Sequence, residues 1–301
     1  MNLAITGASG FIGSALCARL IQDGHALTLL THGAPRDASA SNKRWLHWTP
    51  GAAGEWEKAI DGCDGIINLA GEPIATRRWT NRQKRKIRLS RVDATASLVG
   101  AIAKATKKPK FLISGSAVGI YGDCGNEPLT EQREPGDDFL ASVCRDWEAQ
   151  AAEAESLGCR VALLRTGIVL DAEGGALDAI ARPFQFLVGG PLGSGKQWMS
   201  WIHLDDEIGI IKFIIENEQA RGAINATAPN PVSNGDFSKA LGRAMKRPSW
   251  FGVPAFGLRL MLGEMAEMLL TGQRAIPAAA QRLGYQFRFP ELKAALEACI
   301  R

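Results

Sequence analysis

The chain has 301 residues, of which 46% are hydrophobic and 22% are charged, and its formal net charge is +4. This composition is ordinary for a globular protein with a sizeable core, and no apolar run approaches the roughly 20 residues that cross a bilayer. Six scattered cysteines lack metal-ligand spacing. We therefore expect reduced thiols in a cytoplasmic protein, with no disulfide framework, no metal site and no membrane partner.

The first predicted element is a buried strand at Leu3–Ile5 that runs into a glycine-rich turn. Glycines follow it at three-residue spacing: Gly7, Gly10 and Gly13. Apolar residues at four-residue spacing from Ile12 to Leu20 then indicate a helix. In this order the glycines let the backbone approach a pyrophosphate, and free N–H groups at the helix start hold the anion. We predict a dinucleotide site rather than a plain turn, with further contacts from Ser9, Phe11 and Ile12.

The second predicted strand, Ala26–Thr31, bears on which nicotinamide cofactor binds. NAD-selective folds place an acidic residue about 20 residues after the glycines, where it accepts a hydrogen bond from the ribose 2′-OH. Here no acid occurs until Asp37, so no barrier to a 2′-phosphate is present and we predict NADP(H). His32 is either a phosphate contact or an exposed loop residue. The side chains that could bind the phosphate are Thr31, His32, Arg36, Lys43 and Arg44.

Strand and helix signals alternate through the first half of the chain. Further strands are predicted at Gly65–Leu69, Lys110–Ser114 and Arg160–Leu164, and long helices at Arg82–Lys104 and Phe139–Leu157. The alternation predicts an α/β fold with a Rossmann-type doubly wound parallel sheet and a smaller C-terminal α/β substrate-binding region. We assign residues 1–165, completed by parts of 200–228, to the dinucleotide-binding domain. Residues 166–301 form mainly the substrate-binding region and a C-terminal helical domain.

A basic cluster surrounds the start of the first long helix. It consists of Arg77, Arg78, Arg82, Lys84, Arg85, Lys86, Arg88 and Arg91. Two interpretations stay open: a solvated helix face, or an anion site for a cofactor phosphate or an acidic substrate. The cluster lacks the interleaved aromatic residues of a stacking platform, so we predict no nucleic-acid partner.

The second half of the chain has its own helix signals. Asp205 or Asp206 is expected to cap one helix, and Ser233 to cap the next. The stretch Pro254–Leu270 is helical in pattern and leaves little polar face. This pattern predicts a buried or interface helix rather than a membrane anchor.

Several segments carry a resemblance to a known family. They are Thr6–Gly13, Asn68–Pro73, Ser114–Gly122, Leu164–Leu170 and the run Gln197–His203 (QWMSWIH), which is the most specific. Together they resemble the YfcH-like epimerase family, atypical extended short-chain dehydrogenase/reductases with a C-terminal domain of unknown function. The resemblance spans essentially the whole chain. It implies NADP binding and a nucleoside-diphosphate-sugar epimerase-like fold, without settling the reaction.

The resemblance also implies cofactor contacts. The segment after the third predicted strand should lie near the nicotinamide ribose, and it consists of Leu69, Ala70, Gly71 and Glu72. The later strands should add Ser114 and Arg165 as contacts. Arg165 either binds phosphate or pairs with a buried acid, for which Asp205 is the expected partner. Ser116 matches the family serine that polarises the carbonyl of the substrate.

The usual catalytic Tyr-x-x-x-Lys pair of the superfamily is absent. With Glu148 aligned to the family glutamate, the tyrosine position is Leu140 and the lysine position is Cys144. Neither side chain can donate the proton that hydride transfer to a carbonyl requires. Tyr121 either replaces this donor or packs over the end of the sheet. We therefore name Ser116 and Tyr121 as candidate catalytic residues.

The QWMSWIH run suggests a substrate pocket. Lys196, Trp201 and His203 are the candidate contacts, and for Lys196 and His203 a structural strand is the equal alternative. Two hypotheses remain for the whole chain. It is an NADP-dependent oxidoreductase or epimerase for a small polar substrate such as a nucleotide-linked sugar, or a cofactor-binding protein without turnover. A homodimer through helices 82–104 and 139–157 is also expected from related folds.

Overall fold

The computed structural model describes residues 1–33 and 42–300, and within them seven strands form one parallel sheet. The strand order is β11-β7-β5-β4-β1-β2-β3, so the winding reverses between β1 and β4. This order confirms the predicted doubly wound Rossmann-type sheet. The strands are β1 (Asn2–Thr6), β2 (Ala26–Thr31), β3 (Lys43–His47), β4 (Gly65–Asn68), β5 (Phe111–Ala117), β7 (Arg160–Thr166) and β11 (Gly222–Ala226).

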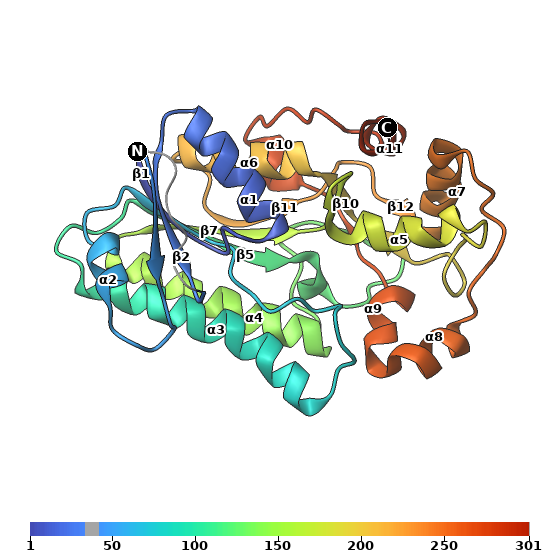
Figure 1. Cartoon of the computed structure of the whole chain (residues 1–301), viewed down its shortest axis with the longest axis horizontal. Helices are drawn as coiled ribbons and strands as arrows, with labels where there is room; N and C mark the ends of the chain where they lie inside the picture. The colour runs from blue at the N-terminus through green and yellow to red at the C-terminus, as the bar shows by residue number, and fades with distance from the viewer. Residues whose placement is uncertain (34–41, 301) are drawn as a thin grey trace.

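Helices cover both faces of this sheet (Figure 1). On one face α1 (Phe11–Gln22) and α6 (Leu204–Glu216) pack over β1, β5 and β7. On the other face lie α2 (Glu55–Ile60), α3 (Asn81–Lys104) and α4 (Phe139–Ala152), with α3 and α4 side by side. Strands buried from both sides explain the near-continuous apolar runs of the sequence.

Two central strands are longer than the sequence predicts. β5 continues to Ala117 and β7 to Thr166, and the two pair in register, with Ser116 opposite Arg165. Ser114, Ser116 and Arg165 therefore lie inside strands and are buried, rather than in loops beyond the strand ends. At α4 the α-helical part ends at Ala152, and a 3₁₀ turn follows.

The C-terminal region forms a smaller α/β unit with its own apolar core. Three two-stranded pairings hold it: β8 (Ile168–Asp171) with β10 (Trp201–His203), β9 (Trp198–Met199) with β12 (Val232–Ser233), and β6 (Pro128–Leu129) with β13 (Arg274–Ala275). The helices are α5 (Gly175–Gln185), α7 (Asn234–Met245), α8 (Ala255–Leu262), α9 (Glu267–Leu270), α10 (Ala278–Arg282) and α11 (Leu292–Cys299). Figure 1 shows α8 and α9 beyond the start of α3.

One predicted helix cap is confirmed and another is wrong. Ser233 caps α7, because its Oγ accepts from the N–H of Asp236 at 3.1 Å. The cap of α6 is His203, whose Nδ1 lies 3.1 Å from the N–H of Asp205. Asp206 instead accepts the backbone N–H groups of Arg288 and Phe289, which ties α6 to the chain before α11.

The apolar stretch Pro254–Leu270 is not one buried helix. Gly263, at φ +62°, breaks it into α8, a 3₁₀ turn and α9. Phe256, Leu260 and Met261 on α8 are largely exposed, so the prediction of burial is wrong there and the interface alternative stays open. In the described part of the chain, no helix has the length and apolar character to cross a membrane.

Candidate cofactor and active site

The glycine turn between β1 and α1 is built for close backbone contact. Gly7 has φ +69°, and a Cβ atom there would lie 2.5 Å from the carbonyl oxygen of Leu69. A Cβ atom on Gly13 would lie 2.2 Å from the carbonyl oxygen of Gly7. Gly10 is the N-cap of α1 and brings no side chain to the first N–H groups of the helix. The turn therefore leaves these donors for an anion, as a pyrophosphate requires.

The remaining predicted contacts of this turn lie around it. Ser9 is exposed, and Phe11 and Ile12 are half-buried at the start of α1. The ring of Phe11 packs beneath the turn before α5, where a Cβ atom on Gly175 would approach it to 2.7 Å. Phe11 thus connects the glycine turn to the C-terminal region.

The end of β2 gathers polar side chains near the predicted 2′-phosphate site. The Oγ1 of Thr31 accepts from the N–H of Gly33 at 3.2 Å, and the His32 ring stacks on Trp48 with centroids 5.2 Å apart. His47, at the end of β3, has Nδ1 3.4 Å from the carbonyl oxygen of Gly33. The sequence reasoning missed His47, although its place at the end of a strand adjoining β2 could have identified it.

Two of the predicted phosphate ligands lie at the wrong end of β3. Lys43 pairs with Leu27, and the Nε of Arg44 donates to the Oγ1 of Thr28 at 2.9 Å. Both positions are at or near the amino end of the strand, whereas the predicted phosphate site is at the carboxyl end. Arg36, the other predicted basic ligand, lies outside the described residues, as does Asp37.

The segment Leu69–Glu72 follows β4 and faces the glycine turn. The Oε1 of Glu72 accepts from Gln83 at 3.3 Å, and the backbone N–H of Glu72 donates to Ser90 at 2.9 Å. Both partners belong to α3. Arg91, on the same helix, donates from Nη1 to the carbonyl oxygen of Glu72 at 3.0 Å. These contacts fix the loop at the carboxyl edge of the sheet.

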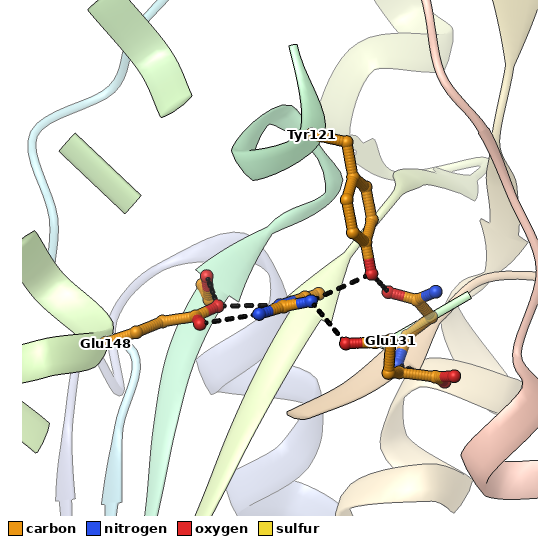
Figure 2. Close-up of polar contacts among 6 residues, drawn as sticks. Tyr121, Glu131 and Glu148 are labelled. Atoms are coloured by element: carbon orange, nitrogen blue, oxygen red, sulfur yellow. Dashed lines mark hydrogen bonds and ion pairs between the residues drawn. The ribbon is translucent and has the colours of Figure 1, made fainter. Parts of the chain in front are cut away.

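A buried ion pair joins Arg165, near the end of β7, to Glu148 on α4 (Figure 2). Arg165 Nε and Nη2 each lie 2.8 Å from one carboxylate oxygen of Glu148. Burial alone lowers the pKa of Arg165, but the pairing with Glu148 outweighs it and raises that pKa. The prediction that Asp205 pairs with Arg165 is wrong, because Asp205 lies on α6, on the other face of the sheet, and pairs with Arg288 at 2.6 Å.

The two candidate catalytic residues both belong to this buried network. Ser116 donates from Oγ to Glu148 at 2.6 Å. The hydroxyl of Tyr121 donates to the side-chain oxygen of Asn225 at 2.7 Å and accepts from Arg165 at 3.0 Å. Tyr121 is 1% exposed, and burial raises the pKa of its hydroxyl. This geometry favours the packing alternative for Tyr121, and its catalytic role stays a prediction.

The network reaches the C-terminal region through residues that the sequence reasoning missed. The carbonyl oxygen of Glu131 accepts from Arg165 at 3.2 Å, and its Oε1 accepts from the N–H groups of Asn225 and Ala279 at 3.0 Å each. Figure 2 shows Glu131 and Glu148 on opposite sides of the arginine. Glu131 lies on an irregular segment, so no periodic pattern marks it.

The positions of the usual catalytic pair hold neutral side chains. Cys144 is buried, which raises its thiol pKa to about 12, so the thiol is protonated at neutral pH.

Ser114 is also buried, with Oγ 3.4 Å from the carbonyl oxygen of Gly115. Across residues 1–33 and 42–300, no group of three His, Cys, Asp or Glu side chains is arranged to hold a metal ion.

The predicted substrate contacts differ in accessibility. Trp201 is fully buried and donates from Nε1 to the carbonyl oxygen of Asn230 at 3.1 Å. His203 caps α6 and stacks on Phe289, and burial lowers its pKa. Lys196 alone has an exposed side chain. The geometry supports the structural alternative for His203, while all three substrate roles stay predictions.

The basic cluster divides between solvent and neighbouring elements. Lys84 pairs with Glu264 at 2.7 Å, and Arg88 pairs with Asp146 and donates to Ser142. Arg91 is half-buried against the loop after β4. The remaining side chains of the cluster are exposed: Arg77, Arg78, Arg82, Arg85 and Lys86. Arg78 also donates from Nη2 to the carbonyl oxygen of Leu260, so four members of the cluster are tied to other parts of the fold and the rest form a solvated surface.

The glycine turn, the reversal of the winding between β1 and β4, and the polar side chains at the strand ends together define a Rossmann-fold protein of the short-chain dehydrogenase/reductase class. The chain belongs to the NAD dependent epimerase/dehydratase family, whose model matches residues 3–226. A domain of unknown function, DUF1731, matches residues 253–299. The family resemblance predicted from the sequence is thus confirmed.

Similar proteins cover the whole chain. The Arabidopsis thaliana protein "Epimerase family protein SDR39U1 homolog, chloroplastic" is 41% identical over 304 residues, covering 100% of this chain and 87% of the relative. The crystal structure of human SDR39U1 with NADPH has a TM-score of 0.87 and 32% identity, covering 100% of this chain and 99% of that one. The nucleoside-diphosphate sugar epimerase from Corynebacterium glutamicum has a TM-score of 0.81 and 39% identity, and the match covers 100% of this chain and 58% of that one.

Proposed function

We propose that this chain binds NADP(H) at the carboxyl edge of its sheet. The observation that carries the proposal is the Gly7–Gly13 turn, where the backbone is packed so closely that a side chain on Gly7 or Gly13 would collide with it. The lack of an acid at the end of β2 favours the 2′-phosphorylated cofactor. The human relative crystallised with NADPH supports the same choice.

Different residues of the chain contact different parts of the cofactor. The first N–H groups of α1, with Ser9 nearby, hold the pyrophosphate, and Thr31, His32 and His47 surround the 2′-phosphate. The segment Leu69–Glu72 contacts the nicotinamide end, and the predicted contact from Ser114 requires the site to open, because Ser114 is buried. When bound, the nicotinamide gives or accepts a hydride at C4.

We further propose an oxidoreductase or epimerase-like reaction on a small polar substrate. In this proposal the Ser116 hydroxyl polarises the substrate carbonyl, and Glu148 holds this hydroxyl in one orientation at 2.6 Å. To polarise a substrate carbonyl, this hydroxyl turns away from the carboxylate, which keeps its two bonds to Arg165. The similarity to the Corynebacterium enzyme supports a nucleotide-linked sugar as substrate.

A second candidate function is cofactor binding without turnover. Two observations favour it: Cys144 is a protonated buried thiol at the lysine position, and the Tyr121 hydroxyl is occupied by two buried partners. Nucleotide sugars incubated with the protein and NADP⁺ separate the candidates. Formation of NADPH or of an epimer, lost in Ser116→Ala, supports the enzyme; no product from any substrate supports the alternative.

Substitution of Gly13 tests the cofactor site directly. Gly13→Ala places a Cβ atom 2.2 Å from the backbone of Gly7, so the turn must shift and NADPH affinity should fall at least tenfold. Gly100→Ala is the matched control, because a Cβ atom on this residue of α3 meets no atom within 4 Å. Unchanged NADPH affinity in Gly13→Ala, measured on folded protein, would contradict the proposal.

We also propose a cytoplasmic location and a homodimer formed by the outer surfaces of α3 and α4. All six cysteines lie in the described residues and are free thiols, which suits a reducing compartment. The two helices lie side by side on one face of the sheet, as a four-helix interface needs (Figure 1).

A further inference from the structure

Arg91 projects from α3 into the space between the loop after β4 and α4. Its Nη1 donates to the carbonyl oxygens of Glu72 at 3.0 Å and Ile87 at 3.1 Å. Its guanidinium lies over the Trp147 ring, with Cζ 5.3 Å from the ring centroid. Two helices and one loop therefore fix the position of this side chain.

Gly71 has a specific relation to this guanidinium. A Cβ atom on Gly71 would lie 2.9 Å from Cζ of Arg91 and 3.0 Å from its Nη2. The guanidinium can approach the loop backbone only because residue 71 lacks a side chain. The arginine thus lies directly against the segment that the proposed site assigns to the nicotinamide end.

The hydrogen bonds of Arg91 leave part of its guanidinium available. All its bonds come from Nη1; in the described ranges 1–33 and 42–300, Nε and Nη2 donate none and no carboxylate forms an ion pair with it. Burial lowers the pKa of this arginine, which indicates a charge partly removed from water. A half-buried cation with unused, rigidly oriented donors is suited to hydroxyl or phosphate oxygens of a ligand.

We propose that Arg91 is the cationic ligand of the nicotinamide ribose in this chain. Its Nε and Nη2 donate to the ribose hydroxyl oxygens, since the position of the usual lysine on α4 holds the neutral thiol of Cys144. Gly71 is part of the same site, because its lack of a side chain leaves room for the guanidinium. The proposal rests on the proposed binding of NADP(H) and adds a positioning residue for that site.

Binding of two ligands to variant proteins tests this role. NADPH contains the nicotinamide ribose, whereas adenosine 2′,5′-bisphosphate carries only the adenosine half and its phosphates. Arg91→Gln should weaken NADPH binding roughly tenfold to hundredfold, because a hydrogen bond to a charged group is lost, and leave the bisphosphate affinity unchanged. Arg91→Lys should recover part of the NADPH affinity, because it keeps the charge.

Two further variants make the experiment specific. Gly71→Ala keeps the arginine but pushes its guanidinium off the loop backbone, so it should weaken NADPH binding in the same direction as Arg91→Gln and by a smaller factor. Arg88→Gln removes a charge one turn away that pairs with Asp146, and it should leave both affinities unchanged. Thermal unfolding of each variant without ligand identifies any loss of folding.

The outcomes separate the two proposals. Equal weakening of NADPH and the bisphosphate in folded Arg91→Gln would show a merely structural role and overturn the inference. Unchanged NADPH binding in both Arg91→Gln and Gly71→Ala would also overturn it, while the proposed cofactor site would stand. If the natural protein binds neither ligand, the proposed function fails and Arg91 loses its role with it.

Discussion

An arginine at the end of a buried strand, such as Arg165, can either bind a phosphate or form a buried ion pair. The sequence predicted either phosphate binding or a buried ion pair, and the structure contains the ion pair with Glu148. Both side chains are about one-tenth exposed or less. Breaking such a pair is costly because it leaves one buried charge without a partner.

Glu148→Gln should therefore lower the free energy of unfolding by about 3 kcal/mol, the low end expected for a broken buried pair. Asp178→Asn is the control, since Asp178 pairs with Arg182 on the exposed side of α5 and its loss should cost less than about 1 kcal/mol. Urea unfolding at pH 7 measures both. Equal effects of the two substitutions would show that the Arg165 pair does not stabilise the fold.

At the scale of elements, apolar patterns predicted most strand and helix positions, because the helices bury one face and the central strands are buried on both. β2 has the predicted bounds, and α3 begins one residue before the predicted start. Sequence could not locate the ends of β5 and β7, because polar Ser116 and Arg165 are satisfied by Glu148 from a distant helix. The His203 cap depends on packing against Phe289, which no local pattern encodes.

Packing of α6 on β7 buries an acidic side chain that makes a pH prediction. Glu207 is fully buried; its Oε1 accepts from Thr166 at 2.8 Å, and its Oε2 has no partner in the described residues. Burial raises its pKa from 4.5 to about 8. Between these values the folded state holds a proton that the unfolded state has released. Stability is therefore fully present below about pH 4.5 and falls as the pH rises towards 8.

Glu207→Gln should remove this loss, because the amide has the same shape and does not ionise. Its free energy of unfolding at pH 8.5 should exceed that of the natural protein by several kcal/mol, at about 1.4 kcal/mol per pKa unit. The difference should shrink at pH 5. Urea unfolding at both pH values measures it, with exposed Glu155→Gln as control. A difference that is independent of pH would contradict a neutral buried Glu207.

At the scale of the molecule, the two regions meet along the carboxyl edge of the sheet. Lys84 of α3 pairs with Glu264 after α8, and Arg78 contacts the carbonyl oxygen of Leu260. The fold class and the glycine site were predictable because they depend on local order of elements. The network of Glu131, Asn225 and Arg165 was not, because its members meet only when three distant segments come together.

The dimer proposal makes a prediction at the same scale. Leu89 is exposed on α3, whereas Leu260 is exposed on α8 in the C-terminal region. An α3–α4 interface predicts that Leu89→Asp yields monomers and that Leu260→Asp leaves the dimer intact, because a buried charge disrupts an apolar contact. Sedimentation velocity distinguishes the two. Dissociation by Leu260→Asp alone would place the interface on α8 and contradict the proposal.

Calorimetric titration of the natural protein with NADPH and with NADH tests the central claim most directly. A glycine turn that holds a pyrophosphate, next to a β2 end without an acid, predicts that NADPH binds at least tenfold more tightly than NADH. Equal affinities would contradict the assignment of the 2′-phosphate site. Binding of neither cofactor would contradict the dinucleotide site itself.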